Sequence, residues 1–305
     1  MSWFYFVVLG PVFAGILLAL AWWLIWGRKR QLSGGGVGAF TVAAGLLLGG
    51  GNVVLLLLGT GLFPLQLPPE YWVWFQDYRF TAPLLLGIVG MVLLAFPVQG
   101  RSGRGVADLT PRTPLSFARG WWFVAPALLL ALILSVTVTA GAASRPDSST
   151  GHYTMYLVDL GGERGMGSSI YGWYNSIPCL ILIGVLIIVA SVDLVLIARP
   201  TPAANREHDV HIRTFRTGNV LAIGTSALLM HLGFILSSLA GTVSITSSFP
   251  TSEGSVTFWT TFAGLQPVLI GASAVAAALG LALCVAVVLS AIPSRRWAPA
   301  RVTTR

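Results

Sequence analysis

YWVWFQDYRFTAPLLLGIVGMVLLAFPV, residues 71–98, is the stretch of sequence that decides the fold. Its part from Phe80 to Val98 contains no charged residue and is long enough to cross a hydrocarbon core about 30 Å thick as a helix. The aromatic residues that precede this part are typical of a membrane–water interface. The stretch therefore predicts a membrane span that carries an acid, Asp77, and a base, Arg79, at its start.

The rest of the chain repeats this apolar character. Of its 305 residues 55% are hydrophobic and only 9% are charged, whereas about 25% are charged in soluble globular proteins. We expect an all-α, polytopic transmembrane helical bundle, in which residues 1–305 form a single integral membrane domain. Together with residues 80–98, the predicted spans are 4–26, 37–63, 121–140, 176–198, 217–241 and 262–292, seven in all.

Basic residues occur in alternate connections between these spans. Of the 18 Lys and Arg residues, Arg79, Arg145 and Arg164 lie in connections of one set, and the other 15 lie in the other set. Because Lys and Arg accumulate on the cytoplasmic side, this pattern predicts the N-terminus outside and the C-terminus inside. The dominance of Arg over Lys is typical of a GC-rich bacterial genome, so we expect a multi-pass protein of the bacterial cytoplasmic membrane.

The longest connection is an external loop, residues 141–175. Polar or glycine-rich runs flank the segment HYTMYLVDL, residues 152–160, which has the composition of a short strand. The loop at about 242–261 is expected to be a short external connection.

Two stripes of small residues predict close contacts between helices. They are Thr41, Gly45 and Gly49 in the second span, and Ala272, Ala276 and Gly280 in the seventh. The second span also contains Asn52 near its middle. Because an unsatisfied amide in lipid costs several kcal/mol, Asn52 is expected to face a protein partner or a cavity.

The charged turn at the start of the third span is the first candidate site. Asp77 and Arg79 are two residues apart, so on a helix they point in different directions and do not pair with each other. Pro83 has no N–H for the carbonyl group of Arg79, which predicts a kink next to the charges. Two interpretations stay open: an outward-facing ligand or ion entrance, or interfacial charges whose side chains reach up to water.

The run DYRFTAPLLL, residues 77–86, resembles the third helix of microbial rhodopsins, in which an Asp supplies the counter-ion to a retinal Schiff base. Seven spans with an external N-terminus agree with that family. However, Trp74 stands where the family has an arginine, and the seventh span has no lysine to hold retinal. The only lysine, Lys29, is in an inner loop, so we do not assign the chain to this family.

His231 is the second candidate site, near the middle of the sixth span. Its neighbours on the same helix face, Gly224, Ala227 and Ser238, are small or polar, which predicts that this face looks into the bundle. A lone histidine there is more often a hydrogen-bonded interior residue than a haem ligand or proton carrier. If Asn52 and His231 line one cavity, replacing either with Leu is expected to impair activity more than expression.

No catalytic or cofactor motif is present. The pair His208 and His211 has only weak metal-site spacing, and the glycine run GGERGMG lacks the strand and helix of a phosphate loop. We therefore expect no metal, no cofactor and no nucleic-acid partner. Cys179 and Cys284 are predicted at different membrane depths, farther apart than the ~7 Å between bridged Cα atoms, so no disulfide is expected.

The function that these observations favour is the membrane subunit or accessory of a small-molecule transport system, whose partners are the lipid bilayer and a separate ATPase or other membrane subunit. The ligand or ion pathway candidates are Asp77, Arg79, Asn52 and His231. The alternatives are a membrane enzyme of cell-envelope assembly, with its site at Asp77, Arg79 and the external loop, and a structural or signalling subunit without a ligand. A five-residue match, Pro83–Gly87 with Pro267–Gly271, also raises the hypothesis that spans 1–3 and 5–7 are a repeat.

Overall fold

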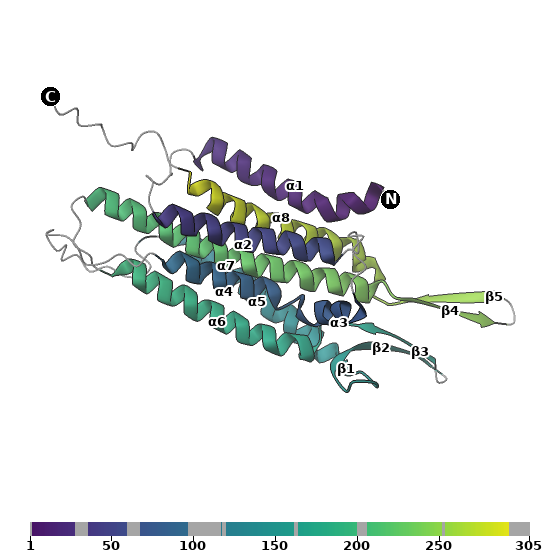
Figure 1. Ribbon diagram of the computed structural model, residues 1–305. Coiled ribbons are helices and arrows are strands. Elements are labelled where there is room, and N and C mark those ends of the chain that lie inside the picture. The colour runs from purple at the N-terminus through teal and green to yellow at the C-terminus, as the bar shows by residue number, and fades with distance from the viewer. Residues whose placement is uncertain are drawn as a thin grey trace, which may run out of the picture.

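The computed structural model describes residues 2–27, 36–59, 68–96, 117, 120–161, 164–199, 206–251 and 254–292. Eight α-helices occur in this part of the chain: α1 (Ser2–Ile25), α2 (Gly36–Leu58), α3 (Pro69–Tyr78), α4 (Ala82–Ala95), α5 (Trp121–Ala143), α6 (Trp173–Ala198), α7 (Arg206–Val243) and α8 (Gln266–Ser290). All except the short α3 run roughly along one direction and form a bundle (Figure 1). The predicted inner segments around residues 28–30, 101–112 and 295–305 lie outside the described residues.

The length and apolarity of these helices indicate a membrane protein. Among the described residues, five helices are long and apolar enough to cross a membrane: α2, α5, α6, α7 and α8. A sixth span results if α3 and α4 are taken together as one broken span, and the apolar stretch of α1, Leu9–Ile25, is shorter. The mostly helical character is thus confirmed, and five or six candidate spans are compatible with a multi-pass membrane protein. The count of seven spans and their orientation stay predictions.

Two small antiparallel sheets extend the fold beyond helices. In the loop between α5 and α6, β1 (Arg145–Pro146), β2 (Tyr153–Gly161) and β3 (Arg164–Ser169) form a three-stranded sheet in that order. The strand expected at residues 152–160 is therefore confirmed as β2. The connection between α7 and α8 is a hairpin of β4 (Thr246–Thr251) and β5 (Gly254–Trp259), where the sequence predicted only a short loop.

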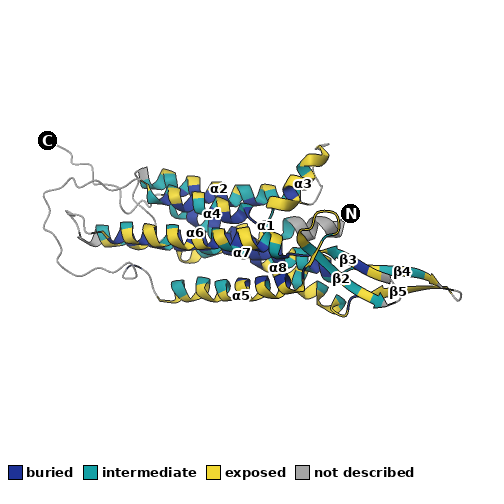
Figure 2. Cartoon of the chain, turned by 90° about the horizontal axis from the view of Figure 1, so that it is seen from below, coloured by how far each residue is buried: buried dark blue, intermediate teal, exposed yellow. Residues whose placement is uncertain are grey.

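Both sheets attach at the same end of the bundle as the start of α1 (Figure 1). We call this the β end. Figure 2 shows that β4 and β5 project away from the helices and carry mostly exposed residues. Gly172 joins the three-stranded sheet to α6, and a side chain could not be accommodated there, because a Cβ atom would lie 2.0 Å from the carbonyl oxygen of Tyr153.

The centre of the bundle is α7, the most buried of the candidate spans. Small residues let the other helices approach closely. A Cβ atom on Gly87 of α4 would lie 2.4 Å from the Cβ atom of Ala227, and one on Gly280 of α8 would lie 2.9 Å from the sulfur of Met230. The stripe predicted in the second span packs on α8, where a Cβ atom on Gly45 would lie 3.0 Å from the carbonyl oxygen of Cys284.

The start of α7 differs from the sequence-based expectation. The predicted span begins at residue 217, but α7 already begins at Arg206 and includes the charged residues in between. Arg213 donates to the carbonyl oxygens of Ile197 and Arg199 at the end of α6, and its Nε lies 2.8 Å from the Asp209 carboxylate. These bonds give the buried guanidinium group of Arg213 hydrogen-bond partners and a counter-charge. A hydropathy pattern does not reveal such partners.

About one turn further along α7, Arg216 donates hydrogen bonds to the last carbonyl groups of a second helix, α4. Its Nη2 donates to the carbonyl oxygens of Leu94 and Ala95, at 3.0 and 2.8 Å. The last carbonyl groups of a helix have no partner within that helix. Two arginines of α7 therefore bind the ends of α6 and α4 that lie opposite the β end.

Cys179 and Cys284 are both free thiols in buried positions, as expected. Cys284 lies 3.0 Å from the hydroxyl oxygen of Ser226, which also donates to the carbonyl oxygen of Gly280.

Candidate functional site

The span that opens with charged residues is broken. Helices α3 and α4 meet at an angle of 67°, across Arg79, Phe80 and Thr81. Pro83 lies in the first turn of α4 and has no N–H to donate to the carbonyl group of Arg79, so the helix does not run through this point. The kink predicted from Pro83 is confirmed.

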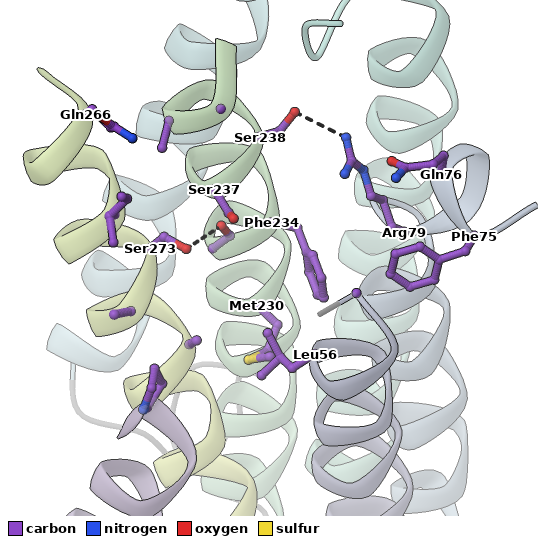
Figure 3. Close-up of a pocket in the computed structure, with 18 residues that line it drawn as sticks. Leu56, Phe75, Gln76, Arg79, Met230, Phe234, Ser237, Ser238, Gln266 and Ser273 are labelled. Atoms are coloured by element: carbon purple, nitrogen blue, oxygen red, sulfur yellow. Dashed lines mark hydrogen bonds between the residues drawn. The ribbon is translucent and has the colours of Figure 1, made fainter. Parts of the chain in front are cut away.

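At this break Arg79 turns toward α7. Its Nη2 lies 3.4 Å from the hydroxyl oxygen of Ser238, which makes a long hydrogen bond (Figure 3). The guanidinium carbon lies 4.6 Å from the centre of the Phe80 ring. The Nε atom of Arg79 is buried and has no hydrogen-bond partner among the described residues.

Asp77 lies elsewhere. It is exposed, and it forms no ion pair with Arg79 in the described part of the chain, as the two-residue spacing predicts. Arg79 is half-buried and its guanidinium has no carboxylate partner among the described residues. The positive charge at the break is therefore not neutralised by the described protein.

Arg79 borders a pocket of about 410 Å³ near the β end. We call it the Arg79 pocket. Its lining comes from α1, α2, α3, α7 and α8, and from Arg79 itself: Pro11, Leu56, Gly59, Phe75, Gln76, Arg79, Met230, Gly233, Phe234, Ser237, Ser238, Ala240, Gly241, Gln266, Ile270, Ser273, Ala274 and Ala277. Figure 3 shows Arg79 and Gln76 on one side of this space and Ser273 and Gln266 on the other.

Small residues of α7 help to leave this space open. Gly233, Ser237 and Gly241 follow one another at four-residue spacing and so share a face of the helix. On α8, Ser273 is held by a 2.8 Å hydrogen bond from its hydroxyl group to the carbonyl oxygen of Gly233. The pocket wall is thus fixed by a bond between the two helices that form it.

His231 and Asn52 are fully buried, which confirms that both point into the bundle. The Nδ1 atom of His231 lies 2.8 Å from the carbonyl oxygen of Phe80, inside the helix break. Because a carbonyl oxygen only accepts, this nitrogen carries the proton. Asn52 instead donates from Nδ2 to the carbonyl oxygen of Leu48 in its own helix, at 2.7 Å. Neither residue lines the Arg79 pocket.

Aromatic rings complete the surroundings of the break. The ring centre of Tyr171, from the loop between α5 and α6, lies 4.8 Å from that of Phe80 and 6.1 Å from that of His231. Burial raises the pKa of the Tyr171 phenol above its ordinary value, so this group stays neutral. The break therefore packs between His231 of α7 and Tyr171 of the loop between α5 and α6.

Of the four pathway candidates, only Arg79 borders the pocket. Sequence reasoning missed the pocket's other polar residues, Gln76, Ser237, Ser238, Gln266 and Ser273. The adjacent serines in the sixth span were a usable signal, because hydroxyl groups in an otherwise apolar span need partners. The lining includes no carboxylate, His or Cys side chain, so the arrangement is suited to binding by one cation and several neutral polar groups.

The fold and this site together define a multi-pass helical protein of the membrane type, with a polar pocket between its helices. Comparisons of the chain with protein families, with curated proteins and with solved structures found no match. Among the described residues, no group of three or more His, Cys, Asp or Glu side chains is placed to hold a metal ion.

Proposed function

We propose that this protein is a membrane subunit of a small-molecule transport system in the bacterial cytoplasmic membrane. The observation that carries the proposal is the Arg79 pocket, which five helices build between them at the β end of the bundle. Ligand sites in helical membrane proteins are typically built in this way, where helices are broken and polar groups face a cavity.

The broken span supports this function. The α3–α4 break lies at the pocket wall, and the freed backbone group at Phe80 is bonded by His231 instead of facing lipid. Non-helical backbone at membrane depth is tolerated only where protein or a cavity surrounds it. A break of this kind gives a transporter both a polar lining and a place where a helix bends.

The distribution of basic residues indicates which side of the membrane the pocket faces. With 15 of the 18 basic residues on the predicted inner side, the β end is the outer end of the protein. The Arg79 pocket then opens toward the outside, and the basic inner segments are available to an energising ATPase or another membrane subunit.

Affinity purification from native membranes, combined with uptake by cells that lack or overproduce the protein, tests this function. Copurification of an ATPase or of a second membrane subunit, together with a solute flux that depends on the protein, is the expected result. Recovery of the protein alone, with no flux and with turnover of a lipid-linked envelope precursor, would instead establish the enzyme alternative.

A further inference from the structure

The charge balance of the Arg79 pocket points to the chemistry of its ligand. Arg79 is the only charged residue among the 18 that line the pocket. Its Nε is buried with no partner among the described residues, and its Nη2 has only a long contact, 3.4 Å, with Ser238. A half-buried cation without a counter-charge is costly, so an anion that enters this pocket gains by neutralising it.

We propose that the Arg79 pocket binds a small molecule with one carboxylate or phosphate group on an apolar body, and that Arg79 holds the oxyanion. The planar guanidinium group matches both groups through two parallel hydrogen bonds. This inference deepens the transport function proposed above, because it names the ligand class of the same pocket.

The remaining lining fits a ligand that is polar at one end only. The Ser238 hydroxyl group and the Gln76 amide lie close to Arg79, where they can donate to an oxyanion, and Ser237 lies farther away, near Ser273 (Figure 3). Leu56, Met230 and Phe234 line the deeper part with apolar side chains. A volume of about 410 Å³ falls within the usual range of ligand pockets, about 300–1,000 Å³.

The oxyanion has two possible sources, a solute from water and an anionic lipid headgroup. Benzoate is a suitable probe of the first, since it joins one carboxylate to an apolar ring, and benzamide is its neutral counterpart of the same shape. The purified protein is placed in phosphatidylcholine nanodiscs, and binding of each probe is measured by calorimetry. The same titration in phosphatidylglycerol nanodiscs shows whether an anionic lipid competes for the pocket.

Benzoate is expected to bind the native protein and benzamide to bind at least about tenfold more weakly. Arg79→Gln is expected to lower benzoate affinity at least about tenfold. Arg79→Lys keeps the charge but loses the two parallel hydrogen bonds of the guanidinium group, so it is expected to lower the affinity by a smaller factor. Ser237→Phe, which fills the pocket, is expected to abolish binding. The matched control is Arg145→Gln, which removes an exposed charge from β1 at the same end and is expected to leave binding unchanged.

Benzoate binding that is present in phosphatidylcholine discs and lost in phosphatidylglycerol discs assigns the pocket to an anionic lipid headgroup and supports the same chemistry. Equal benzoate affinity in the native protein, Arg79→Gln and Ser237→Phe overturns the proposal, and so does absence of benzoate binding and of lipid selectivity. Thermal unfolding of each variant shows that it is folded. Solute flux without Arg79-dependent binding would refute this inference alone and leave the transport function standing.

Discussion

At the scale of single residues, His231 shows how a buried polar side chain is used in this fold. It is fully buried and its Nδ1 lies 2.8 Å from the carbonyl oxygen of Phe80, a backbone group inside the α3–α4 break. Without this bond the carbonyl group would have to find another partner in an apolar interior. His231 therefore stabilises the break that brings Arg79 to its pocket.

Replacing His231 with Leu is expected to destabilise the protein by about 1–3 kcal/mol, the cost of a buried acceptor left without its donor. Thermal unfolding of the purified protein in detergent measures the effect. Ser148→Leu is the control, because that exposed side chain makes no hydrogen bond to a described residue and its loss is expected to cost less than about 0.5 kcal/mol. Equal unfolding temperatures for the two variants would contradict this role. Because His231 lies outside the pocket, its replacement is expected to act mainly through stability.

Arg79 marks the limit of sequence reasoning at this scale. The separate directions of Asp77 and Arg79 and the kink at Pro83 follow from helix geometry alone, and all are present. The contact of Arg79 with Ser238 joins residues 159 positions apart, so no local pattern indicates it. The pocket itself depends on which faces of five helices meet, and a single sequence does not specify that pairing.

At the scale of helices, the contact between α1 and α8 depends on Gly15. A Cβ atom at this position would lie 2.7 Å from the carbonyl oxygen of Ala278 and 2.9 Å from the Cβ atom of Leu281. Backbone and Cβ atoms do not move aside as the end of a long side chain does. Any side chain at Gly15 therefore separates the two helices.

Gly15→Ala is accordingly expected to destabilise the protein by about 1–3 kcal/mol. Gly271→Ala in α8, the helix that Gly15 contacts, is the matched control, since a Cβ atom there meets nothing within 4 Å. Because Ala favours helix more than Gly does, this control is expected to be neutral or to stabilise by up to about 1 kcal/mol. Unfolding of both variants in detergent provides the comparison, and a destabilised control with an unaffected Gly15→Ala would reverse the assignment.

The two arginines of α7 permit a prediction about local stability. Replacing Arg216 with Met leaves the carbonyl groups of Leu94 and Ala95 without their donor, and the last turn of α4 is expected to open more readily. Hydrogen exchange in the last turn of α4, followed by mass spectrometry, should become about tenfold faster. Arg199→Met, which removes an exposed guanidinium group after α6, is expected to leave that exchange unchanged. Unchanged exchange in Arg216→Met would show that the capping bonds do not limit opening.

Several helices were predictable because a membrane imposes a length and an apolar composition on each span. The hairpin of β4 and β5 and the charged first turns of α7 were not, because their polar residues are satisfied by pairing and by capping bonds to distant segments.

The hypothesis that spans 1–3 and 5–7 are a repeat has a simpler local explanation. Pro83 and Pro267 each lie in the first turn of a helix, α4 and α8, where proline is favoured in any fold. The shared five residues therefore do not by themselves indicate duplication.

At the scale of the whole molecule, polar features are divided between the two ends of the bundle. The start of α1 and both sheets lie at the β end (Figure 1). The Arg79 pocket is lined by residues of α7 and α8 next to the β4–β5 hairpin, and the capping arginines of α7 bind the opposite ends of α6 and α4. If the β end is external, the pocket and the sheets are accessible from outside the cell. The proposed function thus depends on the orientation in the membrane.

Single cysteines at Ser148 and Ala204 test this orientation. Ser148 is exposed in the external loop near β1, and Ala204, outside the described residues, is in the connection between α6 and α7. Since Cys179 and Cys284 are buried, they are expected to react slowly with a membrane-impermeant maleimide. In intact cells Ser148→Cys should be labelled at once and Ala204→Cys only after the membrane is opened. Labelling of Ala204→Cys alone would invert the protein and place the pocket inside, and labelling of both from one side would remove α6 from the set of membrane spans.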